Sequence, residues 1–187
     1  MDMQGNRPLS VTQQQAWEAL NDIAVLKVCI PGCDSIEAVG ENVYELTNGL
    51  KVGPVSAKFK GKLHLADIDA PSSYTIHFEG NGGVAGFGKG SAKVTLVPSD
   101  AGCELGYAVH ASVGGKIAQV GQRLIDGVAK SMAESFFKRF DEEMQRHYLP
   151  SEDAAPATEA SGTLKKIWSL LKKMWSTLTA GKANAQP

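Results

Sequence analysis

The fold predicted for this chain is decided by residues 114–147, GGKIAQVGQRLIDGVAKSMAESFFKRFDEEMQRH. Apolar side chains recur there every three or four residues, as in a helix with one buried stripe: Ile117, Val120, Leu124, Val128, Met132, Phe136, Phe140 and Met144. At about 1.5 Å per residue this helix would extend roughly 50 Å, so it needs a long surface to lie on. Gly121 and Gly127 interrupt it, each costing about 1 kcal/mol relative to alanine. We interpret both glycines as points of close packing against a sheet; the alternative is that they leave a void for a ligand.

Two short helices are predicted near the start of the chain. Residues 12–20 form the first, and the pattern S-x-x-Q at Ser10 and Gln13 suggests a capping box at its beginning. Residues 23–28 form the second, which ends before the turn at Pro31-Gly32.

The other segments before residue 114 read as strands, separated by turns that contain glycine or proline. They cover residues 1–9, 34–39, 42–52, 54–68, 73–80, 87–98 and 102–113. Three of them alternate strictly between apolar and polar residues. The apolar face carries Val55, Ala57, Phe59, Gly61, Leu63, Leu65, Tyr74, Ile76, Phe78, Leu105, Tyr107 and Val109. Because no His, Asp or Glu falls on this face of the three strands, the surface beneath the long helix is predicted to be apolar.

Length and charge restrict the class of protein. At 187 residues the chain suits one ordinary domain with an appendage. Its formal net charge is −1, but residues 1–150 carry 14 Lys/Arg against 17 Asp/Glu, whereas residues 164–187 carry five lysines and no acid. This distribution of charge argues against a nucleic-acid binder. Only residues 164–187 are expected to be attracted to an anionic surface.

The cysteines indicate a reducing, cytoplasmic setting. Their number is odd (Cys29, Cys33 and Cys103), and the polar start of the chain lacks the apolar region of a signal peptide. Free thiols are therefore expected. Two thiols do not make a tetrahedral cage, so no metal site is expected at CIPGC, which we interpret as a turn.

The character of the sequence changes at Pro150. Residues 150–163, PSEDAAPATEASGT, are predicted to be a flexible acidic linker, residues 164–178 an amphipathic helix at a membrane surface, and residues 179–187 a disordered tail. The apolar arc of this helix has Leu164, Ile167, Trp168, Leu171, Met174, Trp175 and Leu178, opposite Lys165, Lys166, Lys172 and Lys173. It is too short and too charged to span a bilayer, which needs ~20 apolar residues. Tryptophans and lysines suit the water–lipid boundary instead. The alternative is a helix docked on its own domain or on a partner.

The glycine-rich segment GNGGVAGFGKG, residues 80–90, loosely matches two nucleotide-binding motifs. Both motifs need the loop to open a helix whose amides hold the phosphates. Because an alternating strand follows instead, we interpret the glycines as a sharp hairpin and a flexible rim to a cavity.

No catalytic residue is predicted. His64, His77 and His110 fall on the polar face of their strands, and His147 falls at a helix end. The pattern therefore contains no acid–base pair and no nucleophile with its base.

Five segments resemble the CoxG family of carbon monoxide dehydrogenase subunits: WEALND at 17–22, CIPGC at 29–33, VGPVSAKFKGKLHLADIDAP at 52–71, GKGSAKV at 88–94 and GGKIAQVGQRLIDGVAKSMAESFF at 114–137. The order of elements resembles the helix-grip (START-like, SRPBCC) fold, over about residues 1–147. This resemblance implies an α+β protein in which a curved antiparallel sheet wraps around a long C-terminal helix. It also implies two short helices and an apolar cavity, within a ligand-binding domain of residues 1–149.

The resemblance further implies a non-catalytic accessory protein, linked with attaching the molybdenum-containing CO dehydrogenase, or a related molybdenum hydroxylase, to the inner face of the cytoplasmic membrane. We hypothesise that the cavity holds a prenylated quinone (menaquinone or ubiquinone) or another lipid, and that the protein has no covalent cofactor. The lining would comprise Ala57, Phe59, Leu63, Tyr74, Ile76, Phe78, Leu105, Tyr107 and Val109 from the sheet, and Val120, Gly121, Leu124 and Val128 from the helix. Either tyrosine could bond a polar group of the ligand or be satisfied locally.

Two other functions remain open from the sequence. One is a membrane anchor with a filled core and no ligand. The other is a small-molecule cyclase or hydrolase of the same fold, which the lack of inward acids disfavours.

Overall fold

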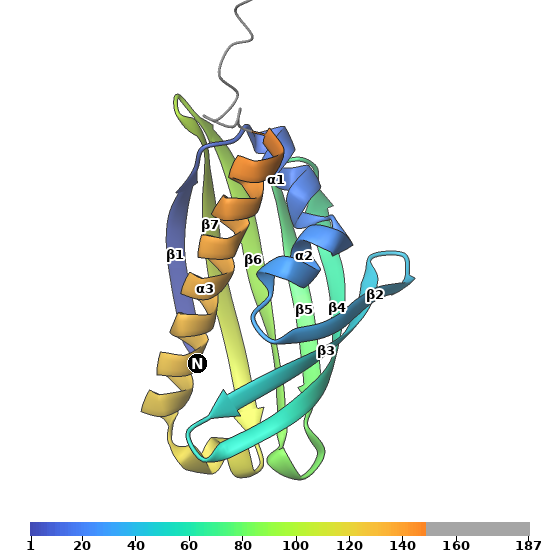
Figure 1. Cartoon of the computed structure of the whole chain (residues 1–187), viewed down its shortest axis with the longest axis vertical. Helices are drawn as coiled ribbons and strands as arrows, with labels where there is room; N and C mark the ends of the chain where they lie inside the picture. The colour runs from blue at the N-terminus through green and yellow to red at the C-terminus, as the bar shows by residue number, and fades with distance from the viewer. Residues whose placement is uncertain (149–187) are drawn as a thin grey trace, which may run out of the picture. The chain divides into compact units, whose positions relative to one another are not determined.

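Seven antiparallel strands form one curved sheet in the order β1-β7-β6-β5-β4-β3-β2 (Figure 1). The structure is a computed structural model that describes residues 1–148. Within that range the strands are β1 (Asp2–Leu9), β2 (Cys33–Gly40), β3 (Val43–Val52), β4 (Val55–Asp69), β5 (Ser73–Asn81), β6 (Phe87–Ser99) and β7 (Gly102–Gly114). From β2 to β7, each strand pairs with the strand that follows it in the sequence. The first strand, β1, pairs with β7, so β1 and β2 are the edges of the sheet.

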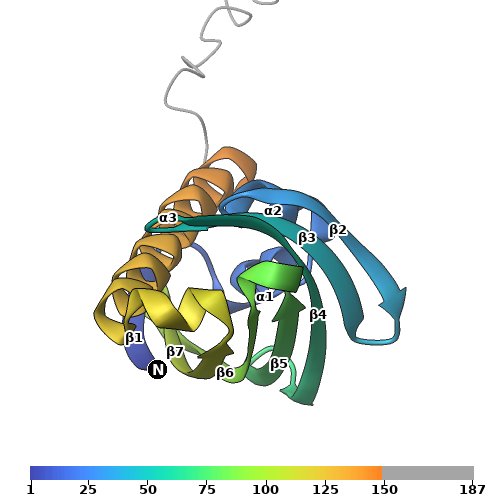
Figure 2. The same cartoon turned by 90° about the horizontal axis from the view of Figure 1, so that it is seen from below.

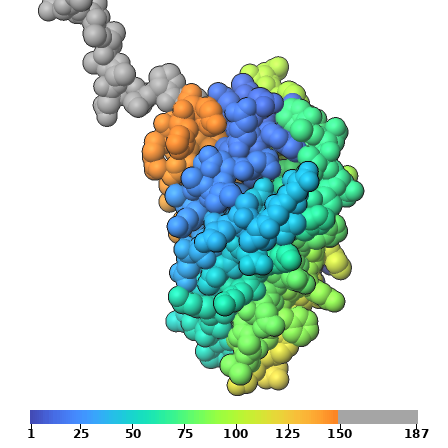
Figure 3. All heavy atoms as spheres, turned by 90° about the vertical axis from the view of Figure 1, so that its right-hand side faces the viewer, coloured from blue at the N-terminus to red at the C-terminus, as the bar shows by residue number. Residues whose placement is uncertain are grey.

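The helices lie on the concave side of this sheet (Figures 1 and 2). They are α1 (Gln13–Leu20), α2 (Ile23–Cys29) and α3 (Gln122–Tyr148), with short 3₁₀ helices η1 (Gly83–Ala85) and η2 (Lys116–Val120). Both short α-helices contact α3, and Figure 3 shows α1, α2 and β2 side by side on one flank of the molecule. The α+β architecture predicted from the sequence is therefore confirmed.

The long helix begins at Gln122 and not at residue 114. Gly114 ends β7, and η2 follows it. Gly121 separates η2 from α3 with φ +93°, a left-handed value that cannot continue a right-handed helix. The interpretation of Gly121 and Gly127 as points of close packing is also wrong. Both are exposed, and a Cβ placed at either would have no neighbouring atom within 4 Å.

The cap of the first helix lies two residues after the predicted one. Thr12, and not Ser10, is the capping residue: its Oγ1 accepts a hydrogen bond from the Gln15 backbone N–H at 3.3 Å, and the Gln15 side chain accepts one from the Thr12 N–H at 3.0 Å. Both pairs fit the capping-box pattern. Ser10 lies before the cap, and Val11 between the two residues packs into the core, where it is only 3% exposed.

Apolar side chains gather in two clusters between the sheet and the helices. The first, which we call the main core, joins α1, α2 and the C-terminal half of α3 to the middle of the sheet. Its buried members are Leu9, Val11, Ala16, Ala19, Leu20, Val25, Cys29, Tyr74, Val94, Leu96, Cys103, Leu105, Phe137, Phe140 and Met144. The second, which we call the end cluster, has Val52, Ile117 and Ile125 as its buried members and lies near the start of α3.

Candidate ligand-binding cavity

An apolar cavity of about 230 Å³ lies within the main core. Its lining comes from the two short helices, four of the central strands, β3 and the C-terminal half of α3: Leu20, Asn21, Leu26, Ile30, Tyr44, Leu63, Leu65, Tyr74, Ile76, Val94, Leu105, Tyr107, Phe136 and Phe137. The alternation of β4, β5, β6 and β7 explains the strand residues, because every second side chain points to the concave face. None of the lining residues is charged, so the polar groups on offer are the Asn21 amide and three tyrosine hydroxyls.

Aromatic contacts hold the tyrosine rings in place. Trp17 of α1 meets Tyr74 edge to face at a centroid distance of 5.4 Å. Tyr107 lies 5.2 Å from Phe137 of α3. Such pairs favour fixed ring positions beyond the effect of burial alone.

Tyr74 is the polar residue that lies deepest in the lining. It is 4% exposed, and burial, followed by the nearby Tyr44, raises the pKa of its phenol well above the usual value. The hydroxyl is therefore protonated at neutral pH and can donate a hydrogen bond. Within residues 1–148 we find no hydrogen bond from this hydroxyl to another residue, so the group is free for a ligand.

One cation lies close to the lining without joining it. Arg7 is on the concave face of β1, and its guanidinium carbon lies 5.6 Å from the ring centroid of Phe137. Asp141 of α3 is nearby: burial raises the pKa of its carboxyl, and Arg7 partly opposes that rise. The guanidinium of Arg7 therefore interacts with the ring of Phe137 and with the carboxyl of Asp141, outside the cavity.

Five of the residues predicted to line the cavity do lie there: Leu63, Tyr74, Ile76, Leu105 and Tyr107. The structure places the others elsewhere: Ala57, Phe59, Phe78, Val109, Val120, Gly121, Leu124 and Val128. Phe59, Val120 and Val128 pack on the end cluster, and Leu124 is 40% exposed. The helix contributes Phe136 and Phe137 instead, because the cavity lies under the second half of α3.

The rest of the lining is not predicted from the sequence: Leu20, Asn21, Leu26, Ile30, Tyr44, Leu65, Val94, Phe136 and Phe137. Leu65 lies on the apolar face already identified, and Phe136 lies on the helix stripe, so both could have been found. The residues of α1 and α2 carry no such signal, since nothing in a short helix shows which part of a sheet it covers.

The outer face of the sheet carries the histidines, as predicted. His64 and His77 are exposed and stack with centroids 6.4 Å apart, and His110 makes a 2.6 Å contact with Asp2. That contact lowers the pKa of Asp2. Among the residues that the structure describes, no group of three or more His, Cys, Asp or Glu side chains is placed to hold a metal ion.

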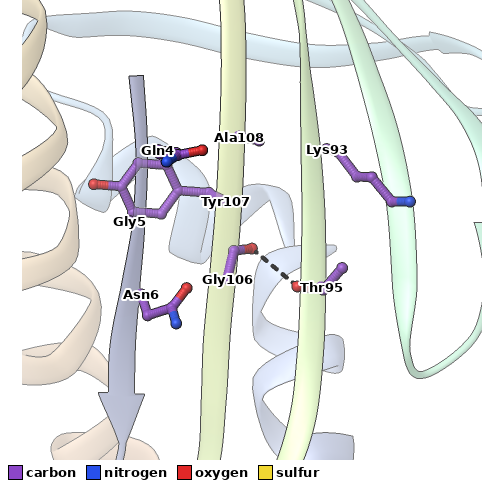
Figure 4. A pocket seen from close by; sticks show the side chains of 8 residues that line it. All are labelled: Gln4, Gly5, Asn6, Lys93, Thr95, Gly106, Tyr107 and Ala108. Carbon is purple, nitrogen blue, oxygen red and sulfur yellow. Dashed lines mark hydrogen bonds between the residues drawn. The ribbon is translucent and has the colours of Figure 1, made fainter. Parts of the chain in front are cut away.

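A shallow groove also crosses the outer face, over β1, β7 and β6 (Figure 4). It is lined by Gln4, Gly5, Asn6, Lys93, Thr95, Gly106, Tyr107 and Ala108, and the Thr95 hydroxyl donates to the Gly106 carbonyl at 3.4 Å. The Tyr107 ring lies over Gly5, where a Cβ would be 2.6 Å from the phenol oxygen. Gly5 thus lets the Tyr107 ring lie against β1 on the concave side, where it also meets Phe137. The groove on the outer face is open and does not enclose a ligand.

Two sequence predictions concern membranes. The membrane-surface helix of residues 164–178 and the segments on either side of it lie outside the described residues. Among the helices of residues 1–148, none is long and apolar enough to cross a bilayer.

Solved structures with this architecture define its class. A conserved protein from Geobacillus kaustophilus is 33% identical, with a TM-score of 0.74 over 78% of this chain and 96% of that one. The Zhui aromatase/cyclase from Streptomyces sp. R1128 is 12% identical, with a TM-score of 0.56 over 78% and 94%. Ara h 8.0201 is 17% identical, with a TM-score of 0.55 over 78% and 98%. This chain therefore has the helix-grip (START-like) fold.

The family follows from the sequence. No curated protein sequence matches the chain significantly. The model of the CoxG family of carbon monoxide dehydrogenase subunits matches residues 5–145, and the chain belongs to that family. The family is one of accessory subunits, although the fold is shared with at least one enzyme, the aromatase/cyclase.

Proposed function

We propose that this protein binds the ring of a prenylated quinone, menaquinone or ubiquinone, in its cavity and presents it to a CO dehydrogenase or a related molybdenum hydroxylase at the inner face of the cytoplasmic membrane. The observation that carries the proposal is the apolar cavity lined by the buried Tyr74, whose hydroxyl makes no hydrogen bond to another residue within residues 1–148. A quinone offers the matching chemistry, because its flat apolar ring bears carbonyl oxygens that accept hydrogen bonds.

The volume of the cavity limits what it encloses. At about 230 Å³ it is smaller than the ~300–1,000 Å³ typical of pockets for drug-sized ligands. A ring system fits this space, whereas a long isoprenoid chain does not. We therefore propose that the ring enters the cavity and that the chain stays outside it.

Membrane attachment completes the proposed role. An enzyme in the cytosol must pass its electrons to a quinone that is held in lipid. The family membership supports an enzyme partner of the CO dehydrogenase kind. The amphipathic pattern of residues 164–178, which have four lysines opposite two tryptophans, supports an anionic membrane surface as the second partner.

The test is to isolate the full chain from quinone-containing cells and analyse its organic extract by mass spectrometry. We expect an isoprenoid quinone in the wild-type extract. Leu105→Trp places a bulky ring in the cavity and should abolish recovery. Val97→Trp is the matched control, because Val97 is 57% exposed and outside the lining.

The outcomes separate the possible functions. An extract without any lipid from the wild-type chain, together with vesicle binding, would identify a membrane anchor without ligand. A different lipid would keep the carrier function but reject the quinone. Equal recovery from Leu105→Trp and Val97→Trp would reject the cavity as the binding site.

Tyr74→Phe tests the proposed hydrogen bond alone. Because one hydrogen bond contributes about 0.5–1.5 kcal/mol, we expect quinone affinity to fall by about two- to ten-fold. Tyr107→Phe is the comparison, since its ring is directed toward β1 and Gly5. If both variants bind equally well, Tyr74 does not contact the quinone oxygen.

A further inference from the structure

Three chain connections meet at the lower end of the molecule, which Figure 2 views directly. They are the β3–β4 turn, the β5–β6 loop with η1, and the β7–α3 connection with η2. The last two loops pack backbone against backbone: a Cβ at Gly115 would lie 2.5 Å from the Gly86 Cα. Gly86 and Gly115 have φ values of +119° and +84°, so glycine suits both positions. The two loops are thus held together as one surface.

Apolar side chains on this surface face the solvent. Val84 is 86% exposed, Phe87 49% and Leu124 40%. They come from η1, β6 and α3, and Leu124 borders the β3–β4 turn, where a Cβ at Gly53 would be 2.8 Å from its Cδ2. Exposed apolar side chains that gather at one end of a protein suit a contact with an apolar partner.

The loops at this end carry cations, and the nearest acid of β5 is Glu79, which pairs across the sheet with Lys62 and Lys89 beside Phe87. Residues 49–57, 80–88 and 113–124 contain Lys51, Lys116 and Arg123, all exposed, and no Asp or Glu. The first acid beyond them on α3 is Asp126, which accepts a 2.6 Å hydrogen bond from the Gln122 side chain. Elsewhere on the outer face acids and bases alternate, as in the 2.7 Å ion pair between Lys58 and Asp34.

We propose that Val84, Phe87 and Leu124, flanked by Lys51, Lys116 and Arg123, form a loop-end surface that binds an anionic lipid bilayer. The apolar side chains would enter the boundary between headgroups and acyl chains, and the cations would lie at the anionic headgroups. An acidic protein would match the three cations but would leave Val84 in water. This contact belongs to the folded domain, so it is separate from residues 164–178 and needs no ligand in the cavity.

The end cluster supports this assignment. Ile117 and Ile125 are 5% and 8% exposed beneath the loop-end surface, and they anchor η2 and the start of α3. The segments that carry the exposed residues are therefore fixed by buried apolar contacts. An apolar side chain on a rigid backbone segment loses little conformational freedom when it enters lipid.

The experiment measures cosedimentation of the full chain with vesicles of phosphatidylglycerol and phosphatidylcholine in equal amounts. Trp168→Glu and Trp175→Glu, combined with Lys165→Glu, Lys166→Glu, Lys172→Glu and Lys173→Glu, remove the apolar and the cationic contributions of the tail, and all loop-end variants are made in that background. We expect this tail variant to keep measurable binding, and Val84→Asp to reduce the remaining binding at least ten-fold. Val39→Asp is the matched control, because Val39 is 50% exposed on β2. Val84 makes so little contact with the protein that its substitution should leave thermal unfolding unchanged.

A second readout places the side chain in the membrane. Val84→Trp, again in the tail variant, should show a blue-shifted fluorescence that brominated lipids quench, whereas Val39→Trp should not. Absence of vesicle binding by the tail variant would overturn the proposal. So would equal binding of Val84→Asp and Val39→Asp, or a tryptophan at position 84 that brominated lipids leave unquenched.

Discussion

The two halves of α3 have the same apolar spacing but different surroundings. In the C-terminal half Phe137, Phe140 and Met144 are at most 9% exposed, and α1 and α2 cover them. In the N-terminal half Leu124 is 40% exposed, and Val128 packs only on the small end cluster. The comparison teaches that periodicity identifies the face of a helix that meets the sheet, but it does not show how much protein surrounds that face.

Replacing Phe140 should have the largest effect. Phe140→Ala would leave a void in a fully buried site and should lower the free energy of unfolding by about 3–5 kcal/mol. Val128→Ala, in the other half, should cost about 1 kcal/mol because Val128 is only half-buried. Urea denaturation of both variants measures the difference. Equal losses would show that the two halves are equally well packed.

The two glycines of the N-terminal half should respond in opposite directions. Gly121→Ala should destabilise by about 1–3 kcal/mol because φ +93° is strained for any residue with a Cβ. Gly127→Ala should stabilise by about 0.5–1 kcal/mol because the position is helical and a Cβ there meets nothing within 4 Å. Thermal unfolding distinguishes these outcomes. A destabilising Gly127→Ala would point to a close contact at that face of α3.

The smallest effect concerns Asp141 in the C-terminal half. Burial raises its pKa above the unfolded value of 3.8, so the folded state binds the proton more tightly than the unfolded state does. This contribution to stability is present at low pH and is lost as the pH rises through the folded pKa. Asp141→Asn should therefore be slightly more stable than the wild type at pH 7, and the difference should vanish near pH 3. Urea midpoints at both pH values provide the measurement, and a destabilised variant at pH 7 would show that the attraction between Asp141 and Arg7 dominates.

Much of the fold is accessible from the sequence, for local reasons. Every strand was predicted within two residues of its observed bounds, because alternation and glycine-containing turns are short-range signals. The start of α3 was not found, since the apolar spacing continues through η2. The two helices are separated only by the positive φ of Gly121. A glycine in the sequence does not by itself show that its φ is positive.

The cavity was accessible only in part. Alternation gives the inward face of each strand, which is why Leu63 and Tyr74 were found. It does not give the position along the strand at which the helices leave a cavity. That position depends on where α1 and α2 cross the sheet, and therefore on tertiary packing. Phe59 and Val128 have suitable patterns but lie at the level of the end cluster.

The free edge of the sheet at β2 has a consequence for self-association. Its pairing with β3 is irregular at both ends, between Cys33 and Ser35 and between Ala38 and Gly40. A distorted border strand offers another copy a poor template for hydrogen bonding. Even at high local concentration on a membrane, neighbouring molecules should therefore not pair through β2 into a continuous intermolecular sheet.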